Sequence, residues 1–114
     1  MNAKAGASAL SDLFGPDADA TFVVGPAHLA ADGAVEPALL TAFAARVAAA
    51  AAGPGTAMVT LNCDVVSRPG AGARVEGRAE IARRTRSLVF LNGRLSVGGE
   101  AVLSVNGVWK VLAG

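Results

Sequence analysis

The longest apolar stretch of the chain runs over residues 32–53, DGAVEPALLTAFAARVAAAAAG. Its large side chains recur at the three- and four-residue spacing of a helix: Leu39, Leu40, Phe43 and Val47. Alanine fills most other positions, and the only charge beyond the first turn is Arg46. A helix that is apolar on nearly every side must be covered by the rest of the fold. The pattern therefore predicts a buried helix over residues 33–53.

Both ends of this stretch carry residues that are typical of helix boundaries. Gly33 suits a strained turn before the helix, and Glu36 lies where a side chain can reach back to free amide groups. Pro37 fits the first turn, because its missing N–H is not needed there. The Gly-Pro-Gly sequence at 53–55 is expected to end the helix.

Downstream of the helix the pattern changes to a period of two, which indicates strands with one buried face. In the first strand, residues 56–67, the predicted inward side chains are Ala57, Val59, Leu61, Cys63 and Val65. In the second, residues 74–84, they are Val75, Gly77, Ala79 and Ile81. Two more strands are predicted over 87–97 and 100–112, joined by a glycine hairpin at 98–99. No helix separates these strands, so we expect an antiparallel meander over residues 56–112.

The segment before the helix is shorter and less regular. Residues 1–19 are expected to form an N-terminal extension, with a short helix over 5–14, and residues 20–24 a short strand. A chain of 114 residues suits one domain, and no internal repeat is visible. The predicted fold class is α+β, with an antiparallel sheet wrapped around one long central helix in a single domain, residues 1–114.

Composition narrows the possible functions. Ten basic residues against nine acidic ones give a net charge of +1, so we expect no nucleic-acid partner. The single cysteine, Cys63, excludes an internal disulfide, and no secretory signal is visible, which together favour a reducing cytoplasm. The long helix is interrupted by Glu36, Pro37 and Arg46, so no membrane span is predicted.

A short strand, a buried helix and a run of long antiparallel strands resembles the hotdog fold. The stretch ADGAVEPALLTAFA at 31–44 is similar to that family's glycine-led helix start, usually His-Gly-Gly followed by a helix. Residues 59–112 resemble the strand series of the small acyl-CoA thioesterases of the phenylacetate-pathway type, with Arg-Pro, Gly, Arg-Ser, Gly-Glu and Gly-Val-Trp in that order. The resemblance covers about residues 20–112.

The resemblance implies an acyl-CoA thioesterase. It implies a homodimer whose sheets join edge to edge, with pairing of two dimers left open, and acyl-thioester sites at the dimer interface near the helix starts. A backbone N–H at the helix start, from Gly33 or its neighbour, would polarise the thioester carbonyl. No cofactor is implied beyond the acyl-CoA substrate.

One position departs from the family's pattern. The family's histidine and first glycine fall on Ala31 and Asp32, and its catalytic acid, seven residues after the second glycine, falls on Leu40. Leucine cannot activate water, so either the acid has moved or hydrolysis is lost.

Four residues near the helix start are candidate replacements for the missing acid or helpers of the reaction. Glu36 lies one turn before Leu40 on the same helix face and is a candidate general base, or simply a helix cap. Asp32 is a second candidate base, or a turn former. His28 is a candidate donor to the carbonyl, or a solvated or satisfied loop residue. Thr41 is a candidate water-holding residue, or bonds its own backbone.

The arginines Arg83, Arg84 and Arg86, with Arg68 in a nearby turn, are candidates for holding the phosphates of coenzyme A, because guanidinium donors form a fork that matches phosphate. The alternative is a solvated strand end. Cys63 is interpreted as a small core residue, and no residues have metal-ligand spacing.

Two other functions remain open. A non-catalytic hotdog protein that binds acyl-CoA or acyl ligands is favoured by Leu40. A hotdog dehydratase or hydratase would need a histidine paired with an acid, and His28 with Glu36 is the only possible pair.

Overall fold

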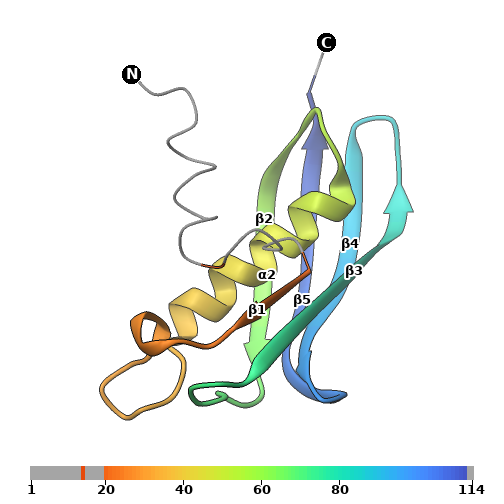
Figure 1. The fold of residues 1–114 in the computed structure, drawn as a ribbon. Coiled ribbons are helices and arrows are strands. Elements are labelled where there is room, and N and C mark those ends of the chain that lie inside the picture. The colour runs from red at the N-terminus through yellow and green to blue at the C-terminus, as the bar shows by residue number, and fades with distance from the viewer. Residues whose placement is uncertain (1–13, 15–19, 113–114) are drawn as a thin grey trace, which may run out of the picture.

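The computed structural model describes Phe14 and residues 20–112, in which one helix lies across the concave side of a curled five-stranded antiparallel sheet (Figure 1). The elements follow in the order β1 (Thr21–Val23), η1 (Pro26–His28), α2 (Pro37–Ala52), β2 (Thr56–Val65), β3 (Arg74–Arg84), β4 (Leu88–Val97) and β5 (Glu100–Val111). The predicted fold class is confirmed. Within this described part, no helix is both long enough and apolar enough to cross a membrane. The predictions of a cytoplasmic location and of one domain over residues 1–114 stay predictions.

The central helix begins four residues later than the sequence suggested. Gly33 takes the expected left-handed turn at φ +84°, and the chain then stays extended to Glu36, whose ψ is 125°. The reason is Pro37, because a proline disfavours helical geometry in the residue before it. Glu36 is the N-cap residue, but its side chain makes no capping hydrogen bond, so the expectation of a side-chain cap is wrong. Gly53 ends the helix at φ +88°, as predicted.

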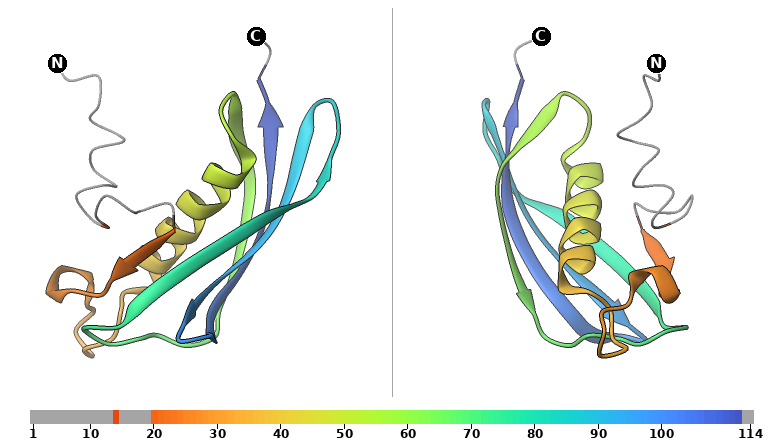
Figure 2. Two further views of the ribbon diagram at one scale, coloured as in Figure 1. Left: turned by 45° about the vertical axis from the view of Figure 1, so that its right-hand side comes forward. Right: turned by 90° about the vertical axis from the view of Figure 1, so that its left-hand side faces the viewer.

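The strand order is β1-β3-β4-β5-β2, so the predicted meander is correct only for β3, β4 and β5. β2 pairs with β5, not with β3, and forms one edge of the sheet. Residues 66–73 carry the chain from this edge past the start of α2 to the far side (Figure 2). There Pro69 O accepts a hydrogen bond of 2.9 Å from Val35 N, and Gly70 bridges to Ala34. The crossover is thus tied to the segment that precedes the helix.

A β-bulge reverses the predicted faces in the first half of β2. The register shifts between Met58 and Thr60, and Met58 lies opposite the buried Trp109. Residues directly opposite in an antiparallel pair share a face, so Met58 faces α2, whereas Ala57 and Val59 were expected to. Past the bulge the predicted inward residues are correct: Leu61, Cys63 and Val65 lie opposite residues that are buried in β5, namely Gly107, Val105 and Leu103.

The alternation in β3 is as predicted. Val75 is fully buried, and the charged residues at 74, 76, 78 and 80 are exposed. The exception is Ile81, which is 42% exposed and lies beside a second register shift, between Ile81 and Arg83.

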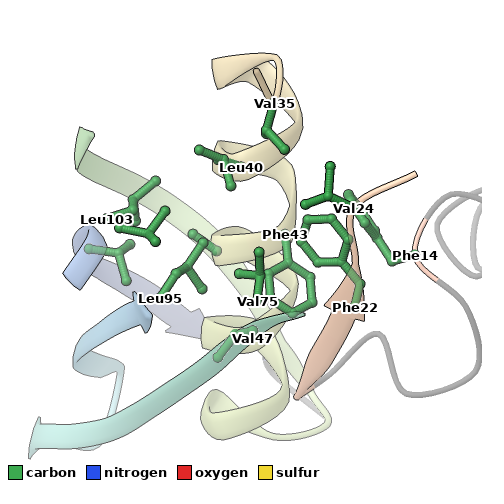
Figure 3. Close-up of a cluster of buried hydrophobic side chains, with 13 residues drawn as sticks. Phe14, Phe22, Val24, Val35, Leu40, Phe43, Val47, Val75, Leu95 and Leu103 are labelled. Carbon is green, nitrogen blue, oxygen red and sulfur yellow. The ribbon is translucent and has the colours of Figure 1, made fainter. Parts of the chain in front are cut away.

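The core lies between α2 and the sheet (Figure 3). Leu40, Phe43 and Val47 of the helix are buried against β3, β4 and β5, while Ala48 and Ala52 leave room for Trp109. Of the predicted N-terminal helix only Phe14 lies inside the described residues. Its ring packs 4.9 Å from that of Phe22 and 5.4 Å from that of Phe43.

Candidate functional site

The segment that leads into α2 is held by its own backbone. Gly33 N donates to Ala30 O at 3.0 Å, Ala34 N to Asp32 Oδ1 at 3.1 Å, and Glu36 N to His28 O at 2.9 Å. Together with the bond from residue 35 to the crossover, these contacts engage every N–H from 33 to 36. The predicted oxyanion donor, the N–H of Gly33, therefore points into this loop.

The first free donor at the helix start lies further along the chain. Pro37 has no N–H, and the N–H groups of Leu39 and Leu40 both bond to Glu36 O, at 2.9 and 3.3 Å. Ala38 is exposed, and among the described residues its N–H has no acceptor. The positive end of the helix dipole and the free amide therefore coincide at Ala38.

Asp32 and Arg68, predicted as a base and as a phosphate ligand, bind each other. The guanidinium donates to the carboxylate through Nη1 at 2.7 Å and Nη2 at 3.0 Å. The bond from Arg68, followed by the one from Ala34 N, lowers the pKa of the Asp32 carboxyl below its ordinary value of 3.8. The same bond to Asp32 raises the pKa of Arg68. A carboxylate held in this way is a poorer proton acceptor than an unpaired one.

Glu36 is the predicted acid whose carboxylate stays unengaged. Its side chain is exposed and makes no hydrogen bond or ion pair within residues 20–112. Its charge lies close enough to Arg68 to contribute to the raised pKa of that guanidinium. Its backbone is held through both polar groups, because the N–H donates to His28 O and the carbonyl accepts from Leu39 and Leu40, so Glu36 is fixed two positions before the Ala38 amide.

His28 is not a solvated loop residue. It is only 8% exposed, its ring centroid lies 5.1 Å from that of Phe22 and 6.0 Å from that of Phe14, and its Nδ1 accepts a 2.9 Å hydrogen bond from Gly25 N. The satisfied alternative that the sequence left open is the one observed. A histidine packed among aromatic rings gives no support to a dehydratase.

Counting from Gly33 places the family's acid on Leu40, and the structure puts Leu40 and the following Thr41 toward the interior of the fold. Leu40 is fully buried in the core, so a carboxylate at this position would point away from solvent. Moreover, α2 contains no aspartate or glutamate at any position. Thr41 is half-buried near the thiol of Cys63; burial raises the pKa of that thiol, and the Thr41 hydroxyl opposes the rise.

The arginine candidates lie at two ends of the molecule. Arg68 lies beside the start of α2, whereas Arg83 and Arg84 lie at the end of β3. At about 3.3 Å per residue, Arg84 is about 33 Å along the strand from its first residue, Arg74. They pair with Phe90 and Val89, so Arg84 shares its face with a buried core residue and Arg83 faces outward. The sequence did not identify Lys110, which the register places opposite Leu88 on this outer face.

Three hollows in the surface of the described residues are lined by none of the predicted site residues. Two, of about 370 and 470 Å³, lie along β3 and β4 and share Arg78 and Arg94. A third, of about 360 Å³, lies at the end of α2 beside Arg46 and Gly53. Among the described residues, no three histidine, cysteine, aspartate or glutamate side chains gather as a metal site requires.

No protein-family profile and no curated protein matches the chain. Solved structures do match it. A variant of the phenylacetic acid degradation protein PaaI from Thermus thermophilus is 27% identical, with a TM-score of 0.74 over 81% of this chain and 82% of that one. A Bacillus halodurans protein solved with CoA has a TM-score of 0.79 at 17% identity, covering 90% and 78% of the two chains.

A hypothetical thioesterase from Streptococcus pneumoniae, solved with coenzyme A, has a TM-score of 0.73 at 12% identity, covering 80% of this chain and 77% of that one. At these low identities the last two matches speak for the fold, and the Thermus protein adds similarity in sequence. Helix, sheet and matches together place this chain in the hotdog-fold thioesterase superfamily.

Proposed function

We propose that this protein is an acyl-CoA thioesterase of the phenylacetate-pathway type, and that it hydrolyses its substrate at the start of α2. One observation carries the proposal: a free backbone N–H at Ala38 and an unengaged carboxylate at Glu36 lie together at a helix N-terminus. Neighbours of the same fold were solved with CoA, which supports an acyl-CoA ligand.

The reaction would proceed through a tetrahedral intermediate. The Ala38 N–H and the helix dipole hold the thioester carbonyl oxygen and stabilise the negative charge that develops there. Glu36 accepts a proton from a water molecule, whose oxygen attacks the carbonyl carbon. When the intermediate collapses, the C–S bond breaks and the CoA sulfur takes the proton from Glu36. The products are the carboxylic acid and free CoA.

A second copy of the chain is proposed to complete the site. β2 is an edge strand of ten residues, and an edge with unpaired backbone groups is a template for pairing. It also exposes large apolar side chains at or next to the strand, with exposed fractions of 51% at Met58, 56% at Val59 and 64% at Val66. Antiparallel pairing of two β2 strands would cover them and form the expected homodimer. Pairing of two such dimers stays a prediction, and sedimentation equilibrium would distinguish the dimer from the tetramer.

That pairing suggests a different set of phosphate ligands from the one expected. The start of β2 lies beside Val111 of β5, and Ser87 O accepts a hydrogen bond from Val111 N. Antiparallel pairing brings this end of one protomer level with the helix start of its partner. Arg84 and Arg86 would then face the partner's site and hold the phosphates of CoA, while Arg68 remains bound to Asp32.

The second candidate function is binding of acyl-CoA without hydrolysis. The absence of any carboxylate from α2 favours it, since the resemblance places the family's acid on that helix. Both candidates use the same ligand, so one experiment separates them.

The test measures thiol release from short, long and aromatic acyl-CoAs for the wild type, Glu36→Gln and the matched control Glu76→Gln, an exposed acid on β3. A fall of tenfold or more in Glu36→Gln alone supports the thioesterase and its base. Equal turnover in both variants rejects Glu36. No turnover with any substrate, together with acyl-CoA binding in calorimetry, identifies the non-catalytic alternative.

A further inference from the structure

We propose that Arg68 is a positioning residue that fixes the segment before α2, so that Glu36 and the Ala38 amide keep the geometry of the proposed site. This inference deepens the proposed function and rests on it. It assigns to Arg68 and Asp32 a role different from the phosphate and base roles that the sequence suggested.

The contacts of Arg68 converge on the residues immediately before Glu36. Nε donates to Val35 O at 2.8 Å, and Nη2 donates to Ala34 O at 3.4 Å in addition to its bond with Asp32. With the Nη1 bond to Asp32, the guanidinium makes four hydrogen bonds to three residues that lie 33 to 36 positions away in sequence. A guanidinium has five N–H donors, so little capacity is left for a phosphate.

Val35 is held on both sides by consecutive residues of the crossover. Pro69 O accepts its N–H at 2.9 Å, and Arg68 Nε donates to its carbonyl oxygen. Its side chain is fully buried in the core. With both backbone polar groups and the side chain fixed, Val35 is an anchor, and the next residue in the chain is Glu36.

Without Arg68 the backbone N–H bonds of residues 33–36 remain, but the Val35 carbonyl and the Asp32 carboxylate lose the guanidinium that ties them to the crossover. Residues 30–36 form neither helix nor regular strand, and Gly33 allows the backbone unusual freedom. Proton transfer and oxyanion stabilisation both depend on distances that a displacement of about 1 Å disturbs. Loss of Arg68 should therefore lower kcat more than it raises KM.

Lysine cannot replace arginine in this role. Its ammonium group is a single point charge, whereas the guanidinium presents donors in a rigid plane that reaches Asp32 and Val35 at the same time. If Arg68 only supplied positive charge to CoA, a lysine would retain most of that function. The conservative variant therefore separates positioning from charge.

The experiment compares kcat and KM for the best acyl-CoA substrate in Arg68→Gln, Arg68→Lys, Asp32→Asn and the control Arg78→Gln, an exposed arginine on β3. We expect kcat to fall tenfold or more in both Arg68 variants with KM changed less than threefold. In Asp32→Asn kcat should fall less, because the bond from Arg68 Nε to Val35 O remains. A raised KM with unchanged kcat, or full activity of Arg68→Lys, overturns the inference.

A second measurement keeps the inference testable if no acyl-CoA is hydrolysed, or if Arg68→Gln folds poorly. Amide hydrogen exchange at residues 33–36 should become at least tenfold faster in Asp32→Asn and Arg68→Lys, while exchange in β4 stays unchanged. Unaltered protection at 33–36 overturns the inference. Absent hydrolysis with faster exchange rejects only the proposed function, because the segment is then still held by Arg68.

Discussion

Gly77 permits the sheet to wrap closely around α2, and its replacement by alanine tests how tightly the two layers pack. A Cβ at this position would lie 2.5 Å from Val47 Cγ2, 3.1 Å from Leu95 Cδ2 and 3.3 Å from Phe43 Cε2. The first distance is shorter than real Cβ contacts allow. Val47 is β-branched and only 4% exposed, so its side chain cannot rotate away. Helix and strand must therefore move apart.

The expected loss follows from two opposing effects. Overpacking of a filled core costs about 1–3 kcal/mol, and replacement of a strand glycine by alanine recovers about 0.5–1 kcal/mol of backbone entropy. Gly77→Ala should therefore lower the free energy of unfolding by about 1–2 kcal/mol. Val47→Ala alone should also destabilise, because it removes two buried methyl groups. Combined with Gly77→Ala it should destabilise less than the sum of the two, by about 1 kcal/mol, because one clash disappears.

Urea unfolding provides the assay, and the fluorescence of the single tryptophan, Trp109, which is 3% exposed, provides the signal. Gly70→Ala is the matched control. Its added Cβ would lie 3.8 Å from the nearest atom, Gly33 O, so its effect should stay within about 0.5 kcal/mol. Equal stability of Gly77→Ala and Gly70→Ala would refute the close approach of β3 to α2. Strict additivity of Gly77→Ala and Val47→Ala would refute it as well.

Three further predictions concern pH, assembly and the packing of Ala48 against Trp109. Because the pKa of Asp32 is lowered in the folded state, the contribution of Asp32 to stability is full above its ordinary pKa of 3.8 and is lost as pH falls through the folded pKa. The free energy of unfolding in urea should therefore change less between about pH 5 and about pH 2.5 in Asp32→Asn than in the wild type. Equal changes in the two proteins contradict this. Val59→Lys on the edge strand should shift a dimer to monomer in sedimentation equilibrium, whereas Ile81→Lys should not; an unchanged dimer in Val59→Lys rejects pairing through β2. Ala48→Leu, at a position 1% exposed beside Trp109, should destabilise by about 1–3 kcal/mol and alter the tryptophan emission; unaltered stability would mean that this cluster has spare room.

Most of the fold was predictable from the sequence, because buried apolar residues recur at the spacing of the helix or strand that carries them. Val75 and its inward neighbours on β3 alternate with charged residues, and the structure follows that pattern. The bulge in β2 carries no sequence signal, since Ala57 and Met58 are both apolar and either one suits the inward face. Strand order is a non-local property, and alternation gives only the faces of a strand and not its neighbours.

The candidate site was less predictable, because its assignments depend on which polar groups are already engaged. Nothing in the sequence indicates that the Gly33 N–H bonds to Ala30 or that Asp32 binds Arg68 across the crossover. The start of α2 did carry a signal: Pro37 marks the first helical residue, and the residue before a proline is rarely helical. Because the helix starts at Pro37, which has no N–H, the first free amide at the helix start belongs to Ala38 and not to Gly33.

The missing acid on α2 has a consequence that does not depend on how the family's spacing is counted. Counting from Gly33 reaches Leu40, and counting from Ala38, the residue with the free amide, reaches Ala45; neither is a carboxylate. A base for hydrolysis must therefore come from outside the helix. Glu36 meets this requirement because it precedes α2 directly and its carboxylate is unengaged, whereas Asp32 is bound to Arg68. Activity that survives Glu36→Gln but requires a dimer would then place the base on the partner subunit.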